Sequence, residues 1–374
     1  MLRVSLALLA IAVVLAVVAT PAPAAEQFAG VTERGSLVGF TSQNPFALTR
    51  PRRVVGLAPG ERLVALGAGA RGVMAVGTSA RLYALDVAAA RATAIGPPFP
   101  QGLRGARFSL AVTPASDRAR LLSDVGQDLV IDLATGATAV GPGLRRERDG
   151  AQVRPAADMT ADGSLVGVQI NPAVLLRELA RGTTTMAEMP FAAPRGIALG
   201  EPAGFQLGSD GTGYVLAVAS EQLRYRQSVI TLIDPPTGNR AGPPGRNVQF
   251  FGRRIAAFAA LGHVPNDRRV ARVRVGVPAR ISAGTLMRRR IPLLVRTREA
   301  AQVTASVRVR GRSVGFAFET RDTPGLFQFR LFSLSKGETR RLRSGIGGKV
   351  RIVVRVNDLK GNRRTVVKIA RLTR

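Results

Sequence analysis

The chain has 374 residues, of which 46% are hydrophobic and 21% charged, and its 54 Lys and Arg against 24 Asp and Glu give a net charge of +30. This length allows two domains with proper cores, because single cores rarely grow beyond about 250–300 residues. The absence of Cys excludes disulfide bonds, a thiol nucleophile and thiolate metal sites.

The first 24 residues differ in composition from all that follow. Arg3 gives a positive start, and residues 6–19 form an uninterrupted apolar run of 14. A bilayer-spanning helix needs about 20 apolar residues. Residues 1–24 are therefore predicted to be a cleaved secretory signal peptide, with Ala22 and Ala24 as the small residues before the cleavage site. The alternative is an uncleaved N-terminal anchor, the one route by which we expect the chain to reach a membrane.

From residue 28 onward the apolar residues fall in runs of four to eight, bounded by Gly, Pro, Asp or Asn, which is typical of short β-strands. One sequence pattern, which predicts a strand, a turn and a second strand, occurs at 81–98, 129–143 and 228–244. Residues 164–190 fit as a degenerate copy, and 35–56 as a partial one. Repeats of 40–50 residues with about four strands each are typical of propeller blades.

The turn in these copies has a plain physical role. Asp132, Thr135 and Gly136 form an Asp-x-x-Thr-Gly turn, which recurs as Asp234, Pro235, Pro236, Thr237 and Gly238. The Asp side chain can accept hydrogen bonds from backbone N–H groups ahead of it, and Gly tolerates the positive φ that closes a hairpin. We interpret the repeated strand–turn–strand pattern as the outer hairpin of each blade.

The first unit, 28–57, lacks its innermost strand, and residues 246–262 supply a hydrophobic segment after the last full unit. A sheet that combines the N-terminal and C-terminal strands would close the ring and remove a free edge. Residues 28–262 are thus predicted to form a five-bladed β-propeller-like domain, or a six-bladed one if 190–227 holds another unit.

Residues 108–143 resemble the repeats of a secreted bacterial family known only as a domain of unknown function. In that family an Asp-Arg-x-Arg-x-x-Ser-Asp-x-Gly-Gln segment precedes the Asp-x-x-Thr-Gly turn. The matching residues here are Asp117, Arg118, Arg120, Ser123, Asp124, Gly126, Gln127, Asp132, Thr135 and Gly136. The resemblance extends more weakly over 28–262, and it departs at Asp86, which no Thr-Gly follows. It implies a propeller-like fold and export, and no established activity.

The residue composition changes at 262–269, and the strands predicted after this segment are rich in Arg. Residues 262–269 are predicted to be a linker, which contains Pro265, Asn266 and Asp267. Residues 267–374 hold 28 Lys and Arg against six Asp and Glu, a net charge of +22. Seven or eight predicted strands, including one at 339–345, have the number and size of an Ig-like β-sandwich. The final pair resembles the closing hairpin of bacterial Ig-like and fibronectin-type modules, with its turn at 357–362.

Arginines alternate with apolar residues in this last third, at Arg272, Arg274, Arg308, Arg310 and Arg312. Alternation places them on the outward face of a sheet. That face is either simply solvated, in an Arg-rich chain, or an anion-binding surface for wall polymers, acidic polysaccharide or lipid headgroups. Nucleic acid is not expected, because proteins that bind it through a basic face usually place stacking aromatic side chains among the basic residues. The spacing of Phe316, Phe318, Phe327, Phe329 and Phe332 instead predicts core packing.

No catalytic, cofactor-binding or metal-binding residues are predicted. His263, the only histidine, falls in the predicted linker and is a poor general base there. Asp124 with Asp128, or Asp158 with Asp162, could hold a metal, but the surrounding Asp-Gly segments read as hairpin turns without enough oxygen ligands for Ca²⁺.

The expected function is that of an exported, non-catalytic interaction or scaffold protein of the bacterial cell surface or extracellular space. We expect a monomer without a cofactor, and its partner is an unknown protein or an anionic cell-envelope polymer. The alternative is an exported propeller enzyme, a hydrolase or lyase, with an unrecognised active site in the funnel. A purely structural envelope component is the third hypothesis.

Export predicts cleavage after Ala24, because the peptidase requires small residues at positions 22 and 24. N-terminal sequencing of the secreted protein should therefore begin at Ala25. Recovery of Met1 in a membrane fraction would contradict cleavage and favour the anchor.

Overall fold

The computed structural model describes most of the chain after the predicted signal. The described residues are 25–42, 44, 48–114, 116–169, 173–190, 199–219, 228–237, 239, 248–250, 254–263, 272–299, 301–321, 325–331, 334–358 and 362–374. Residues 1–24, to which we assign the signal peptide, lie outside this set. In the described part of the chain no helix is long and apolar enough to cross a bilayer.

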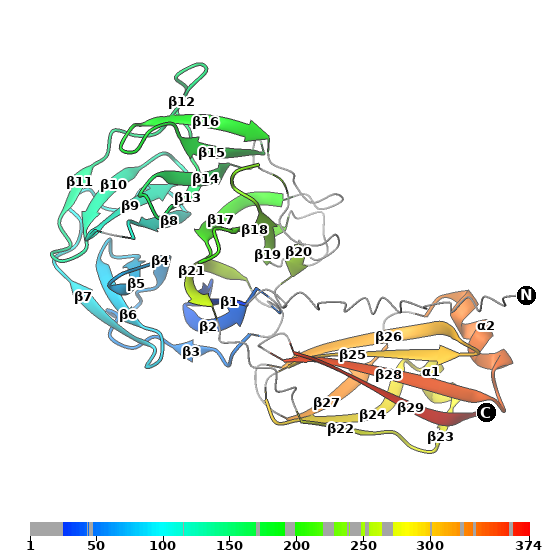
Figure 1. Cartoon of the computed structure of the whole chain (residues 1–374). Coiled ribbons are helices and arrows are strands. Elements are labelled where there is room, and N and C mark those ends of the chain that lie inside the picture. Colours follow the sequence, from blue (N-terminus) through cyan, green and yellow to red (C-terminus); the bar gives the residue numbers. More distant parts are fainter. Residues whose placement is uncertain are drawn as a thin grey trace, which may run out of the picture.

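The described residues up to 263 form five small, mainly antiparallel sheets that resemble propeller blades and follow one another around a ring (Figure 1). The first sheet comprises β21 (Ile255–His263), β1 (Glu26–Thr32), β2 (Ser36–Thr41) and β3 (Arg52–Arg53). The second comprises β4 (Leu63–Gly69), β5 (Gly72–Gly77), β6 (Leu82–Asp86) and β7 (Arg91–Ile95). The third comprises β8 (Phe108–Val112), β9 (Arg118–Ser123), β10 (Asp128–Asp132) and β11 (Thr138–Val140).

The last two sheets complete the ring. The fourth holds β13 (Ala156–Met159), β14 (Leu165–Gln169), β15 (Val174–Glu178), β16 (Thr185–Pro190) and, parallel to β16, β12 (Arg145–Arg146). The fifth holds β17 (Leu199–Leu207), β18 (Gly213–Ala219), β19 (Ser228–Ile233) and β20 (Val248–Phe250). The innermost strands contact their neighbours in a closed cycle, from β21 through β4, β8, β13 and β17 back to β21.

The predicted closure is confirmed. β1 pairs antiparallel with β21, from Glu26 opposite His263 to Thr32 opposite Ile255. The hydrophobic segment that we assigned to closure divides in two, because β20 completes the outside of the fifth sheet before β21 enters the first. Strands from the two ends of the repeat region therefore share one sheet.

The outer hairpins also form as predicted. The Asp132 carboxylate accepts hydrogen bonds from the backbone N–H groups of Ala134 and Thr135 at 2.9 and 2.8 Å, and Gly136 has φ +74°. Asp86 accepts from Ala89 N–H at 2.8 Å in the copy that has no Thr-Gly. Asp234 accepts from the Thr237 hydroxyl at 2.6 Å, whereas Gly238 lies outside the described residues.

The other motif residues of the third sheet join strands to one another. Arg120 and Asp128 form a buried pair, with Nε to Oδ1 at 3.2 Å and side chains only 11% and 3% exposed. Asp128 also accepts from Gly143 N–H at 3.1 Å. Asp117, by contrast, meets Arg71 of the neighbouring sheet in a pair that is about half exposed, with Nη2 to Oδ2 at 2.7 Å.

Ser123, Asp124 and Gln127 organise the turn between β9 and β10. Ser123 Oγ accepts from Gln127 N–H at 3.0 Å, and Asp124 Oδ1 accepts from Ala106 N–H at 3.0 Å. The Gln127 amide donates to the carbonyl of Gly102 at 2.9 Å and accepts from Arg104 N–H at 2.8 Å. The motif residues therefore have structural roles: they hold the third sheet together and tie it to the 102–106 segment and to Arg71 of the second sheet.

The residues after 271 form two sheets around one core. The three-stranded sheet comprises β22 (Val273–Gly276), β24 (Arg290–Thr297) and β27 (Gly325–Arg330). The five-stranded sheet has the order β23 (Arg280–Ser282), β29 (Arg363–Thr373), β28 (Lys349–Asp358), β25 (Ala301–Val309) and β26 (Arg312–Arg321). Val295 and Phe327 of the smaller sheet share a buried cluster with Val303 and Ile352 of the larger one.

The strand predicted at 339–345 is wrong. This segment belongs to α2 (Lys336–Ser344), and a second, shorter helix, α1 (Ala283–Met287), was not predicted. Ser335 caps α2: its hydroxyl accepts from Glu338 N–H, and the Glu338 carboxylate accepts from Ser335 N–H. The Ser-x-x-Glu spacing is a known helix-start signal, and it outweighs the apparent alternation of Arg and Leu in the segment.

The outward prediction is confirmed for Arg274 and Arg308, which are exposed and alternate with the buried Val273, Val307 and Val309. It does not hold for Arg310, which lies in the turn after β25, or for Arg312, which pairs with the buried Val309 at the end of the sheet.

The phenylalanines fall into two groups. Phe327 and Phe329 pack in the core. The core assignment is wrong for Phe316 and Phe318, which are 50% and 42% exposed because both lie on the outward face of β26. Phe332 lies outside the described residues.

A contact joins the two parts of the chain beside the first sheet (Figure 1). Asn44, which is 2% exposed, donates from its amide to the carbonyls of Asp358 and Asn357 at 2.9 and 3.2 Å. The hairpin of β28 and β29 thus rests against the loop that follows β2. His263, placed in the linker by our prediction, is instead the last residue of β21, and residues 264–271 lie outside the described set.

The two ion pairs of the third sheet should differ sharply in their effect on stability. Asp128→Asn leaves the buried Arg120 without a counter-charge, so the free energy of unfolding should fall by about 3 kcal/mol or more. Asp117→Asn, the matched control in the exposed pair, should lower the free energy of unfolding far less, because solvent screens an exposed ion pair. Urea unfolding followed by circular dichroism measures both, and equal losses would contradict the structural role of the buried pair.

Candidate functional site

The innermost strands of all five sheets meet at a central pocket of about 660 Å³. Its lining residues come from the ends of these strands and the turns after them. They include Ala68 and Gly69 of β4, Val112 of β8, Asp158 and Met159 of β13, Leu207 of β17 and Ala260, Leu261 and Gly262 of β21. Because every sheet contributes, the pocket exists only when the ring is closed.

Glycines let the innermost strands approach closely beside the pocket. A Cβ atom added to Gly67 of β4 would lie 2.4 Å from the carbonyl oxygen of Leu110 in β8. One added to Gly69 would lie 2.4 Å from the Val112 side chain. Gly67 and Gly69 therefore allow β4 to pack closely against β8.

Glu26 is a buried carboxylate at the pocket wall, with a side chain only 1% exposed. It accepts hydrogen bonds from the N–H of Gly262 at 2.6 Å and from the N–H and hydroxyl of Ser209 at 3.1 and 2.8 Å. Its Oε2 lies 3.7 Å from Nδ1 of His263. Glu26 thus ties the first sheet to the turn after β17, and its carboxylate is the neighbour of His263.

Asp158 is the second buried carboxylate of the pocket. Its two oxygens accept from Met159 N–H and Leu207 N–H, each at 2.9 Å. Burial raises the pKa of Asp158 to about 7, although both backbone hydrogen bonds act in the opposite direction. The group can therefore gain or lose a proton near neutral pH, and it joins the fourth sheet to the fifth.

The structure does not bring together either pair of aspartates that we considered for metal binding. Asp162 caps its own turn, accepting from the Thr160 hydroxyl and from Ser164 N–H, while Asp158 points to Leu207. Asp124 and Asp128 serve the turn and ion pair already described. Among the described residues no group of three or more His, Asp or Glu side chains is gathered as a metal site.

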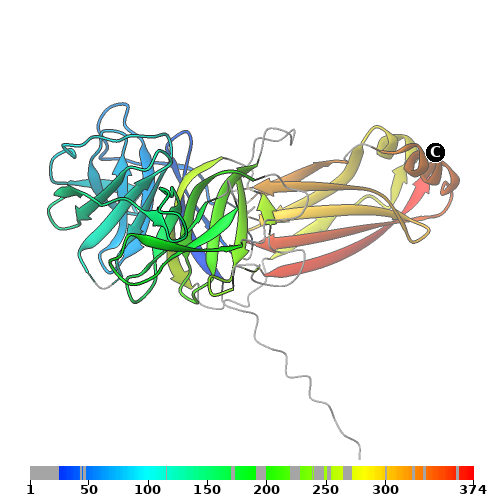
Figure 2. The same cartoon turned by 90° about the horizontal axis from the view of Figure 1, so that it is seen from above.

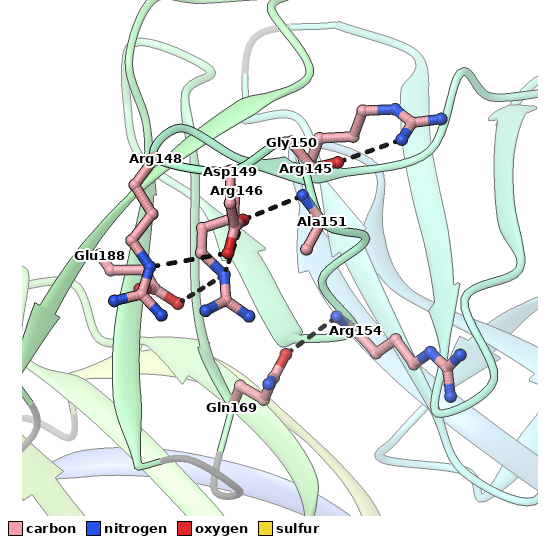
Figure 3. Close-up of polar contacts among 9 residues, drawn as sticks. All are labelled: Arg145, Arg146, Arg148, Asp149, Gly150, Ala151, Arg154, Gln169 and Glu188. Atoms are coloured by element: carbon pink, nitrogen blue, oxygen red, sulfur yellow. Dashed lines mark hydrogen bonds and ion pairs between the residues drawn. The ribbon is translucent and has the colours of Figure 1, made fainter.

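A cluster of charged side chains on the fourth sheet was not singled out from the sequence (Figure 3). Arg146 lies between two carboxylates, with its Nε 3.2 Å from Glu188 Oε1 and 3.5 Å from Asp149 Oδ1. Arg148 lies 3.7 Å from both acids, and Arg145 donates to the carbonyl of Gly150 at 3.1 Å. These contacts fasten the 144–151 hairpin to β16, so the cluster is a structural one.

Comparison with known proteins adds a partial family match. Residues 36–169 match a family described as Domain of unknown function (DUF4394). These residues include the motif that carries the resemblance inferred from the sequence. No curated protein matches the chain.

Solved structures with some similarity are distant in sequence. A structural genomics protein of unknown function from Bacteroides thetaiotaomicron is 12% identical, with a TM-score of 0.38, over 61% of this chain and 58% of that one. PorZ, an essential surface component of the type-IX secretion system of Porphyromonas gingivalis, is 8% identical, with a TM-score of 0.34, over 92% and 51%. The β-propeller domain of Cps50 (Swd1) from Myceliophteria thermophila is 11% identical, with a TM-score of 0.33, over 94% and 98%. The chain thus spans little more than half of the two bacterial proteins, and likenesses of this size carry no functional argument.

Asp158 should make stability depend on pH. Its pKa is higher in the folded state than the ordinary value of 3.8, so its contribution is fully present below about pH 4 and is lost as the pH rises through about 7. A difference of three pH units corresponds to about 4 kcal/mol. The gap in unfolding free energy between wild type and Asp158→Asn should change by up to this amount between pH 4 and pH 8.

The matched control is Asp162→Asn in the turn that follows β13. Hydrogen bonds from Thr160 and Ser164 lower the pKa of the exposed Asp162, so this substitution should leave the decline between pH 4 and pH 8 in place. Chemical denaturation at a series of pH values measures both variants. A wild-type profile that Asp158→Asn leaves unchanged would show that the group does not titrate in this range.

Proposed function

We propose that this protein is an exported, non-catalytic binding protein of the bacterial cell surface or extracellular space. In this proposal residues 28–262 are a five-bladed propeller whose central pocket is a binding face. Residues 267–374 are a basic Ig-like sandwich that contacts anionic envelope polymers. The protein acts as a monomer without a cofactor. The expectation that nucleic acid is not its partner assumed that the phenylalanines of this region pack in the core, which is wrong for Phe316 and Phe318.

The observation that carries the proposal is the position of the excess positive charge. Residues 267–374 carry a net charge of +22, and several of their cations lie on the exposed outward face of the five-stranded sheet, for example Arg308, Arg351 and Arg355. Charges held in fixed positions on a sheet attract a polyanion more effectively than the same charges on a flexible tail, since less conformational freedom is lost on binding.

The two buried carboxylates of the pocket have structural partners. Both oxygens of Asp158 accept from backbone N–H groups, and so do both oxygens of Glu26. These carboxylates hold neighbouring sheets together, which is a structural use. Export itself rests on the predicted signal at 1–24 and on the family resemblance.

An exported propeller enzyme, a hydrolase or lyase, is the second candidate. The observation that favours it is Asp158, a pocket carboxylate with a pKa of about 7, because a general acid or base works best near the operating pH. The two candidates differ in whether the bound polymer is altered.

Binding and turnover can be measured in one experiment. The purified chain is mixed with polygalacturonate or polyphosphate at increasing salt, and both co-sedimentation and polymer length are followed. We expect binding that weakens steeply with salt, since the Debye length shrinks to about 8 Å at physiological ionic strength, and no shortening of either polymer. Shortening that Asp158→Asn abolishes would favour the enzyme, and the absence of binding to both polymers at low salt would overturn the proposal.

A further inference from the structure

The outward face of the five-stranded sheet has a composition that core packing does not explain. In a sheet, directly paired residues of neighbouring strands point to the same side. The pairs with buried side chains, such as Val303 with Val356, define the inner side. The alternate pairs therefore lie outside, and β25, β26, β28 and β29 lie side by side there (Figures 1 and 2).

Five cations adjoin one another at one end of this face. Arg308 pairs with Arg351, and Lys349 pairs with Arg371, which in turn pairs with Arg280. All five are exposed, and no carboxylate of the described residues forms an ion pair with any of them. Like charges directly opposite each other on neighbouring strands destabilise a sheet. An anion seated between them would remove this repulsion.

An apolar band lies beside the cations on the same face. Phe316, Ser306, Val353 and Val367 form one row across four strands, and Ile369 adjoins Arg351 in the row of cations. Phe316 is 50% exposed and Ile369 62% exposed. Phe318, in the row beyond, shares that row with Thr304 and Arg355. Phe316 and Phe318 are the most exposed aromatic side chains of the described residues.

A ligand that fits this face must offer anionic groups and apolar surface together. Guanidinium groups bind carboxylates through two parallel hydrogen bonds, and the apolar band gains free energy when it is covered. Arg351 and Arg355 lie on the same strand about 13 Å apart, at about 3.3 Å per residue. An extended chain that carries its charges at intervals can therefore use both arginines.

We propose that the outward face of the five-stranded sheet binds an acidic polysaccharide, whose carboxylates pair with Arg308, Arg351 and neighbouring cations while its sugar rings cover Phe316 and Phe318. This inference rests on the proposed function, of which it names the binding face and the ligand class. A polyphosphate has the charges but no sugar rings, and would leave the band in water. A second copy of the chain carries the same positive charge and is repelled.

The edge of the same sheet is consistent with a face that binds as a monomer. Among the described residues, the side of β29 away from β28 is paired only at its C-terminal end, where β23 joins it at residues 371–373. Arg364 and Lys368 lie opposite the buried Val356 and Ile352, so they belong to the inner side of the sheet. Inward-pointing charges on an edge strand oppose pairing with another chain.

The test compares three double variants of the full chain in binding to polygalacturonate. Arg308→Ala with Arg351→Ala should weaken binding about tenfold or more and should lower the slope of log K against log salt by about two. Phe316→Ala with Phe318→Ala should weaken binding several-fold and leave the salt slope unchanged. Arg274→Ala with Arg296→Ala is the matched control, because it removes a cross-strand Arg pair from the other sheet. It should change the affinity less than twofold.

Further probes separate the ligand classes. Polyphosphate should bind more weakly than polygalacturonate and should not respond to the Phe substitutions. Tighter binding to vesicles of anionic phospholipid, lost in the Phe variant, would overturn the proposal in favour of a lipid surface. Equal losses from the two Arg variants would show that the charge acts without a specific face. If all three variants bind like wild type, this face fails while the proposed function stands, and if wild type binds no polyanion, the proposed function fails as well.

Discussion

The antiparallel pairing of β1 with β21 is the interaction on which the rest of the ring depends. It places the first and last strands of the repeat region in one sheet, so the sheet is built from residues more than 220 positions apart, such as Glu26 and His263. Without it, β1 would leave an open sheet edge, and the cycle of contacts among the innermost strands would be broken. The central pocket exists because this cycle is closed.

Two buried carboxylates reinforce the same closure. Glu26 and Asp158 each accept N–H groups from the segment around β17, at Ser209 and Leu207, and so bind the fifth sheet to the first and to the fourth. A buried carboxylate is unfavourable unless hydrogen bonds or opposite charges compensate for lost hydration. For Asp158 the two backbone hydrogen bonds do not fully compensate for the lost hydration, so its pKa is raised. The two pocket carboxylates therefore help to hold the five sheets of the ring together.

Much of the ring could be predicted from local patterns. The outer hairpins depend on contacts within a few residues, such as Asp132 with Thr135, and these repeat visibly in the sequence. The candidate site was not predicted. Glu26 and Asp158 sit far apart in the chain without any motif. His263 was assigned to a linker from the residues that follow it, and its partner Glu26 is more than 230 residues away. No local signal marks such pairs, since only ring closure brings them together.

Local patterns were enough to predict the all-β class, the repeats, the closing strand and the outward position of arginines such as Arg274 and Arg308, because each depends on a period of two or on turn residues close in the chain. These patterns did not decide which side chains lie next to one another across strands. The capping box at Ser335 made a helix where alternation suggested a strand, and Phe316 and Phe318 lie outside because β26 turns that face to solvent. Registers such as Arg308 opposite Arg351 are set by packing of the whole sheet, so only the tertiary structure could place five cations beside an exposed aromatic band.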